Sequence, residues 1–61
     1  MKLLKTADLE DITGIPKGTL NQYAYLGTGP AFVKLNGHRR YRPEDVEAWI
    51  ASNRHPIEVV Q

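Results

Sequence analysis

The chain contains no cysteine, which excludes disulfide bonds and thiolate metal sites. Its two histidines, His38 and His55, are far apart in the sequence and do not form a zinc site by themselves. No apolar run approaches the ~20 residues that a membrane-spanning helix needs, and the opening stretch, residues 1–5, is too short for a signal peptide. We therefore expect a soluble, cytoplasmic protein without metal, cofactor or small-molecule ligand.

Acidic residues are missing from the middle of the chain. All 7 carboxylates lie outside residues 12–43. The net charge of +1 hides this separation, which is typical of a surface that binds a polyanion. Chance clustering in a short chain is the alternative. The acid-free block contains these cations: Lys17, Lys34, Arg39, Arg40 and Arg42.

Side chains arranged for catalysis are also missing. The chain has no cysteine nucleophile, no carboxylate pair in an apolar setting, no phosphate-cradling loop and no credible Ser-His-Asp set. Glu44 and Asp45 are typical of a helix start, where the helix dipole favours negative charge. His38 beside Arg39 indicates a phosphate contact or a solvated turn rather than a base. We expect a binding protein and not an enzyme.

Two short helices are predicted in the first half of the chain. Residues 7–13 follow Thr6, a good N-cap, and Leu9 and Ile12 give the helix a buried stripe. Gly14 ends this helix with a positive φ. The second helix is predicted over residues 16–26, with Pro16 in its first position and Leu20, Tyr23 and Ala24 on its apolar face. Two helices around a three-residue, glycine-containing turn indicate a helix-turn-helix.

The opposite face of the second helix carries polar groups and no acid. One cation, two amides and a phenol suit phosphates and base edges, which predicts a DNA-recognition helix. The amides can bond adenine in bidentate fashion, Thr19 and Tyr25 are better placed for phosphates, and Gly18 allows close approach of the backbone. A polar surface helix, with Gly18 at a frayed end, is the alternative. The candidate DNA-binding residues here are Lys17, Gly18, Thr19, Asn21, Gln22 and Tyr25.

A hairpin is predicted after the breaker cluster at residues 27–30. Asn36-Gly37 separates two strand-like runs and favours a type I′ turn, so cross-strand partners should sum to 73. Phe32 then faces Tyr41, and Lys34 faces Arg39, a destabilising pair of like charges that an anion would compensate. A slipped register is the alternative. The wing candidates are Lys34, Asn36, Gly37, His38, Arg39 and Arg40, with Arg42 as a further contact to the DNA backbone.

The last helix should begin at Pro43 and stop around residues 52–53. Its apolar face includes Trp49, which we expect to anchor the core; base stacking is the alternative role. Residues 1–53 are thus predicted to form one domain. Residues 54–61 form a tail that is either disordered or an interaction segment, with Ile57, Val59 and Val60 available to extend a neighbouring sheet.

The order helix, turn, helix, two-stranded wing, helix resembles the small winged helix-turn-helix of the excisionase and AlpA-like family, related to the DNA-binding part of MerR-type regulators. The resemblance spans roughly residues 3–53. Pro16 departs from the family's usual serine, and Gln22 stands where a basic residue is common. The matching motifs are Thr6-Ala7-x-Leu9, Thr13-Gly14-Ile15, Thr19-Leu20, Gly27-Thr28-Gly29-Pro30, Arg39-Arg40-Tyr41-Arg42 and Asp45-Val46-Glu47-Ala48-Trp49-Ile50.

The resemblance implies a DNA-binding excisionase, a recombination directionality factor. Such a protein binds tandem sites in double-stranded DNA, bends the DNA and assists an integrase, with further copies of itself on the same site. It implies a nucleoid-associated protein of a prokaryote or phage. An AlpA-like transcriptional regulator at a promoter is the alternative within the family. A protein-interaction module that uses the basic wing on an acidic partner is the alternative outside it.

Overall fold

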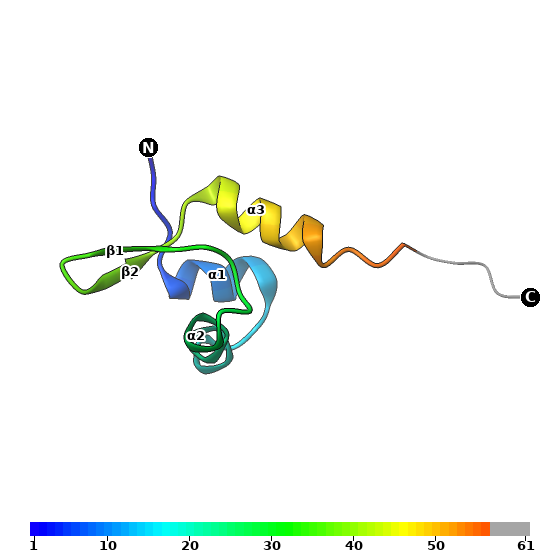
Figure 1. Ribbon diagram of the computed structural model, residues 1–61, viewed down its shortest axis with the longest axis horizontal. Coiled ribbons are helices and arrows are strands. Elements are labelled where there is room, and N and C mark those ends of the chain that lie inside the picture. Colours follow the sequence, from blue (N-terminus) through cyan, green and yellow to red (C-terminus); the bar gives the residue numbers. More distant parts are fainter. Residues whose placement is uncertain (57–61) are drawn as a thin grey trace, which may run out of the picture.

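The computed structural model describes residues 1–56, which fold into three helices and a two-stranded hairpin (Figure 1). This is the mostly helical winged helix-turn-helix that the sequence predicts. The predictions for Ile57, Val59 and Val60 lie outside the described residues. The elements in chain order are α1 (Thr6–Thr13), α2 (Lys17–Leu26), β1 (Val33–Leu35), β2 (His38–Arg40) and α3 (Pro43–Ser52).

Helix α1 begins one residue earlier than the sequence indicates. Lys5, not Thr6, is the N-cap, because the carboxylate of Asp8 accepts the Lys5 backbone N–H at 2.8 Å (N to Oδ2). An acid in the first turn thereby satisfies a donor that the helix leaves free. Gly14 ends α1 with φ 76°, as predicted.

The turn between α1 and α2 is held by the Thr13 hydroxyl. It donates to the Leu9 carbonyl at 2.6 Å and accepts the Ile15 N–H at 3.2 Å. Pro16 is the N-cap of α2, with φ −59° and ψ 146°, and not its first helical residue. The extended backbone at Pro16 changes the chain direction, so α2 does not continue α1 but lies below it in Figure 1, where it is seen nearly end-on.

The hairpin has the predicted register. Asn36 at φ 52° and Gly37 at φ 86° form the two-residue turn, and Lys34 pairs with Arg39 across the strands. The slipped alternative is therefore excluded. Just beyond β2, Tyr41 exchanges two backbone hydrogen bonds with Leu4, at 2.8 and 2.7 Å, which ties the base of the hairpin to the start of the chain.

The core is small and takes one side chain from each part of the fold. Within residues 1–56, the hydrophobic core cluster of buried side chains comprises Leu9 of α1, Leu20 of α2, Tyr41 after β2 and Val46 of α3. Ile12, predicted to be buried, is 55% exposed, because a two-turn helix buries only a narrow stripe.

Trp49 is not the core anchor that its size suggests. Tyr41 is the largest fully buried side chain, and Trp49 is half-buried at the edge of the core. Its indole Nε1 donates to the Thr28 carbonyl at 3.0 Å, and its ring lies 6.3 Å from that of Tyr23, centroid to centroid. Trp49 therefore fastens α3 to the end of α2 and to the segment that follows it.

Replacing Trp49 by Phe should lower the free energy of unfolding by about 1 kcal/mol. The substitution removes the indole hydrogen bond to Thr28 but keeps an aromatic ring beside Tyr23. Urea unfolding followed by circular dichroism measures the change. A loss of about 3 kcal/mol or more, the range of large core truncations, would show that Trp49 is a core residue after all.

Candidate nucleic-acid interface

Helix α2 exposes the polar face that the sequence predicts. Leu20 is buried against the core, and the side chains on the far side of the helix reach solvent, with Tyr25 88% exposed. Thr19 is half-buried at the border. The helix carries no acid in its first turn, and the space around Gly18 is open. The exposed candidates on α2 are Lys17, Gly18, Asn21, Gln22 and Tyr25.

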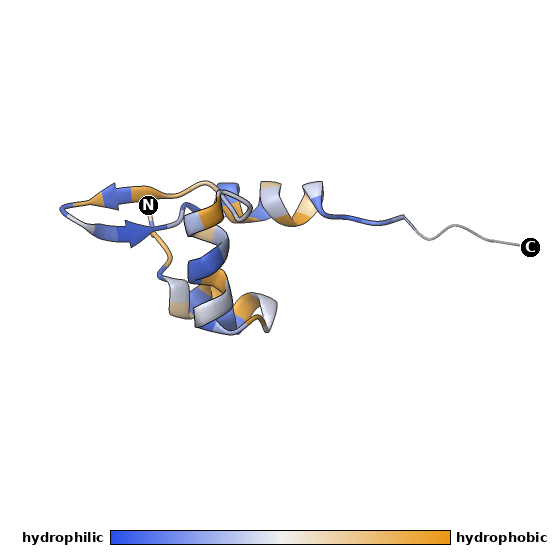
Figure 2. Ribbon diagram, turned by 60° about the horizontal axis from the view of Figure 1, so that its bottom comes forward, coloured by the Kyte–Doolittle hydropathy of each residue, from blue (hydrophilic) through white to orange (hydrophobic). Residues whose placement is uncertain are grey.

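The hairpin projects from the helices as a narrow arm whose β2 strand is hydrophilic (Figure 2). Side chains alternate across the strands, so the pair Lys34 and Arg39 lies on one face and Arg40 on the other. Arg40 donates from Nη1 to the Arg39 carbonyl at 2.7 Å. At the tip, Asn36, Gly37 and His38 are exposed.

Arg39 of the like-charged Lys34–Arg39 pair has two neutral partners within the protein. Arg39 Nη1 donates to Asn21 Oδ1 of α2 at 2.9 Å, and its guanidinium carbon lies 5.1 Å from the centre of the Phe32 ring. Phe32 in turn meets the ring of Tyr41 edge to face, 6.0 Å between centroids. These contacts stabilise the Arg39 guanidinium beside Lys34 and join the wing to α2, and the anion between the two cations stays a prediction.

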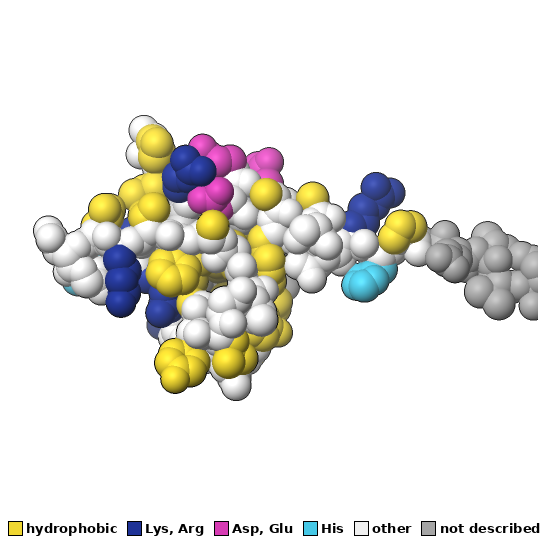
Figure 3. All heavy atoms as spheres, viewed as in Figure 1, with side chains coloured by type: hydrophobic (Ala, Val, Ile, Leu, Met, Phe, Trp, Pro, Cys, Tyr) yellow, Lys and Arg dark blue, Asp and Glu magenta, His cyan; other side chains and the backbone are white. Residues whose placement is uncertain are grey.

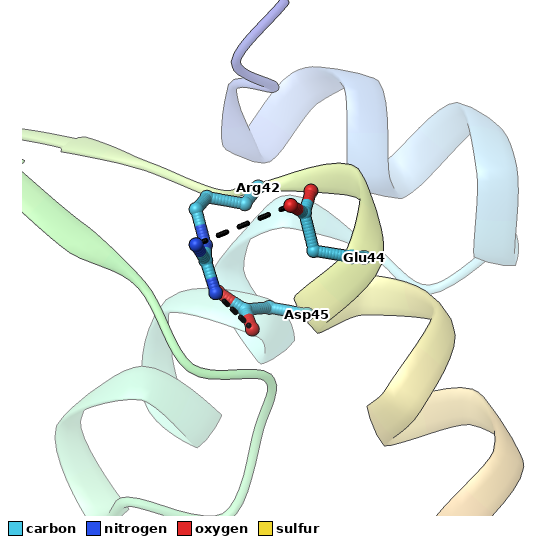
Figure 4. Close-up of polar contacts among 3 residues, drawn as sticks. All are labelled: Arg42, Glu44 and Asp45. Atoms are coloured by element: carbon cyan, nitrogen blue, oxygen red, sulfur yellow. Dashed lines mark hydrogen bonds and ion pairs between the residues drawn. The ribbon is translucent and has the colours of Figure 1, made fainter. Parts of the chain in front are cut away.

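Arg42 is the N-cap of α3 and lies beside the two acids of its first turn, Glu44 and Asp45 (Figure 4). It forms a bidentate pair with Asp45, with Nε to Oδ2 at 2.9 Å and Nη2 to Oδ1 at 3.2 Å, and its Nη1 is 4.0 Å from Glu44 Oε2. The hydrogen bond with Asp45 is the main reason that the pKa of Arg42 is raised. The i, i+3 spacing of an arginine and an acid at a helix start was the available signal for this pair.

The Arg42–Asp45 pair should make stability depend on acid pH. The hydrogen bond from Arg42 lowers the pKa of Asp45 below its ordinary value of about 4. A lowered folded-state pKa contributes stability above the unfolded-state pKa, and that stability is lost as pH falls through the folded-state pKa. Melting temperatures measured from about pH 5 downwards should fall more steeply for the parent chain than for Asp45→Asn. Identical pH profiles would contradict the pairing.

On the face that Figure 3 shows, most charges of opposite sign are separated. Figure 3 shows cations gathered between the hairpin and α2, while acids lie over the start of α3 together with one further cation. The basic region combines exposed side chains from α2 with both strands of the hairpin. Separation of this kind favours a polyanion at the α2–hairpin side and disfavours it at α3.

One groove on the surface lies outside the basic region and contains no residue of α2 or the hairpin. A shallow, mainly apolar groove of about 360 Å³ is lined by residues of α1, the following turn and the end of α3, including Ile12, Ile15, Trp49 and Ile50. Within residues 1–56, no three potential metal-binding side chains of His, Asp or Glu come together. Over the same range, no helix is long and apolar enough to cross a bilayer.

A helix-turn-helix whose second helix is exposed beside a basic two-stranded wing defines a DNA-binding domain. Comparison with known families agrees: residues 3–54 match the helix-turn-helix domain family, and the chain belongs to that family. No curated protein and no solved structure gives a significant match to the chain.

Proposed function

We propose that this protein is a sequence-specific DNA-binding excisionase, a recombination directionality factor of the AlpA-like and MerR-related group. The observation that carries the DNA interface is the hydrogen bond between Arg39 of the wing and Asn21 of α2, which makes two separate basic and polar elements one continuous surface. The excisionase role rests on the motif resemblance, above all Gly27-Thr28-Gly29-Pro30 and Arg39-Arg40-Tyr41-Arg42.

In this proposal α2 enters the major groove and the hairpin reaches the adjacent minor groove or the sugar-phosphate backbone. Lys17, Asn21 and Gln22 are exposed on α2 and of the types that read base edges. Thr19 and Tyr25 flank them and suit phosphates. Asn36, Gly37 and His38 at the wing tip, with Lys34 and Arg40, extend the contact along the backbone.

The small size of the domain limits how tightly a single copy can bind DNA. A single module of this kind buries only ~600–1,000 Å² on DNA, so one copy binds weakly. Several copies on tandem sites together give stable occupancy, and their combined contacts bend the DNA into the shape that an integrase partner uses for excision. The protein performs no bond chemistry itself and acts in the cytoplasm, on the nucleoid, as a prokaryotic or phage-encoded protein.

The closest competing function is an AlpA-like transcriptional regulator, which would make the same contacts at a promoter. Selection of bound fragments from the source genome, followed by footprinting of the best one, distinguishes the two. Cooperatively filled repeats at an attachment site or beside an integrase gene support the excisionase. A single site over a promoter supports the regulator. No enrichment over bulk DNA at moderate salt rejects both, and then favours an acidic protein partner for the wing.

A further inference from the structure

Arg39 fixes the orientation of the Asn21 amide on the exposed side of α2. Arginine carries only hydrogen-bond donors, so the Asn21 atom at 2.9 Å from Arg39 Nη1 must be the carbonyl oxygen Oδ1. The two N–H groups of Asn21 Nδ2 are therefore turned away from Arg39. The contact thus decides which half of the amide is free to meet DNA.

The arginine side of this contact is itself held in place. The guanidinium lies over Phe32, at 5.1 Å, and Phe32 packs on the fully buried Tyr41. Arg39 Nε is enclosed, so the base of the guanidinium lies within the hairpin, where it has no hydrogen-bond acceptor among the described residues. Asn21 is consequently oriented by a side chain that is anchored to the core.

When Asn21 is bonded to Arg39, its side chain offers DNA different hydrogen-bonding groups from those of a free asparagine. A free amide can bond adenine in bidentate fashion, because Oδ1 accepts from adenine N6 while Nδ2 donates to N7. Here Oδ1 already accepts from a cation, and the neighbouring guanidinium repels a further donor such as adenine N6. The part of Asn21 left to face a base, Nδ2, carries donors only.

We infer that Arg39 is a positioning and specificity-determining residue, which converts Asn21 from an adenine-reading group into a donor-only group that selects guanine. Guanine presents two acceptors, N7 and O6, on its major-groove edge and suits a pair of donors. This inference rests on the proposed DNA-binding function and revises one step of it, the adenine contact expected for Asn21 from its type alone.

The test compares base preference at one position in two variants of the full chain. Arg39→Met keeps an unbranched stem over Phe32 and removes every donor to Asn21. Lys34→Met is the matched control: it removes one exposed cation directly across the strands, and Lys34 makes no hydrogen bond to Asn21. Both proteins are first checked for the parent circular dichroism spectrum. Selected duplexes carrying either G·C or A·T at the position nearest Asn21 are then titrated by fluorescence anisotropy.

The parent chain should prefer the G·C duplex by roughly tenfold, the size of one good base contact. Arg39→Met should lose that preference or reverse it toward A·T, while Lys34→Met should weaken both duplexes equally and keep the ratio. Specific binding by the parent chain with an unchanged ratio in Arg39→Met would overturn the inference and leave the DNA-binding function standing. Absence of any specific duplex for the parent chain would instead overturn the proposed function.

A second variant covers the case in which Arg39→Met does not fold. Asn21 is exposed on α2, so Asn21→Asp should not disturb the core. The new carboxylate still accepts a hydrogen bond from Arg39, so the link between wing and helix is retained. It removes both Nδ2 donors, and the G·C preference should disappear. A persistent G·C preference in Asn21→Asp would show that the amide donors do not read the base, which also overturns the inference.

Discussion

Replacing Tyr41 by Ala should leave most of the chain unfolded at 25 °C. Tyr41 is the largest fully buried side chain, packs with Leu9, Leu20 and Val46, and supports the ring of Phe32. Truncating a buried aromatic costs about 3–5 kcal/mol, and a domain of this size rarely has more than about 3–5 kcal/mol in total. Thermal unfolding followed by circular dichroism should show little or no cooperative transition above room temperature.

Tyr41→Phe is the matched control, because it keeps the ring in the core and removes only the hydroxyl. This variant should unfold cooperatively near the parent melting temperature. A cooperative transition for Tyr41→Ala within a few degrees of the parent would contradict the central place of Tyr41 in the core.

Binding to DNA should weaken steeply as salt is added. Within residues 1–56 the ion pairs with acids involve Arg42, which leaves four cations of the basic region without an acidic partner. Cations at the interface displace counterions from the duplex whether they lie at a phosphate or a base edge, so four of them give a slope of up to about −3.6 in a plot of log affinity against log salt, and a fourfold rise in salt lowers affinity roughly 100-fold. The four cations are Lys17, Lys34, Arg39 and Arg40.

Single substitutions show how much each cation contributes to the salt dependence of DNA binding. Lys34→Ala should reduce the magnitude of the slope by about 0.9, the value for one released contact. Lys2→Ala removes an exposed cation that lies outside the α2–hairpin surface and should leave the slope unchanged. Equal effects of the two substitutions would indicate that only net charge attracts the protein to DNA, without a defined interface.

Local chemistry explains why the hairpin turn and the C-terminal ends of α1 and α2 were predictable. Asn36-Gly37 adopts positive φ at both positions, which fixes a two-residue turn and with it the pairing of Lys34 with Arg39. Gly14 and Gly27 end their helices in the left-handed region for the same reason. These features depend on neighbours in sequence, and the sequence contains all the information they need.

Contacts between distant residues were not predictable in the same way. Arg39 and Asn21 are 18 positions apart, and their hydrogen bond arises only when the hairpin folds back beside α2. That Tyr41 rather than Trp49 is the large aromatic side chain at the centre of the core has a similar origin. Size alone favoured Trp49, but the backbone pairing of Tyr41 with Leu4 directs Tyr41 to the centre, whereas Trp49 reaches outward to Thr28.

Mapping of backbone amide shifts by NMR, as a selected duplex is added to the labelled full chain, tests the proposed interface most directly. The largest changes should fall on residues 17–25 of α2 and residues 34–40 of the hairpin, with the Asn21 side-chain amide among them. The groove that includes Ile12 and Ile50 should change little. Changes concentrated in that groove, with α2 and the hairpin unaffected, would contradict the assignment of the DNA-binding surface.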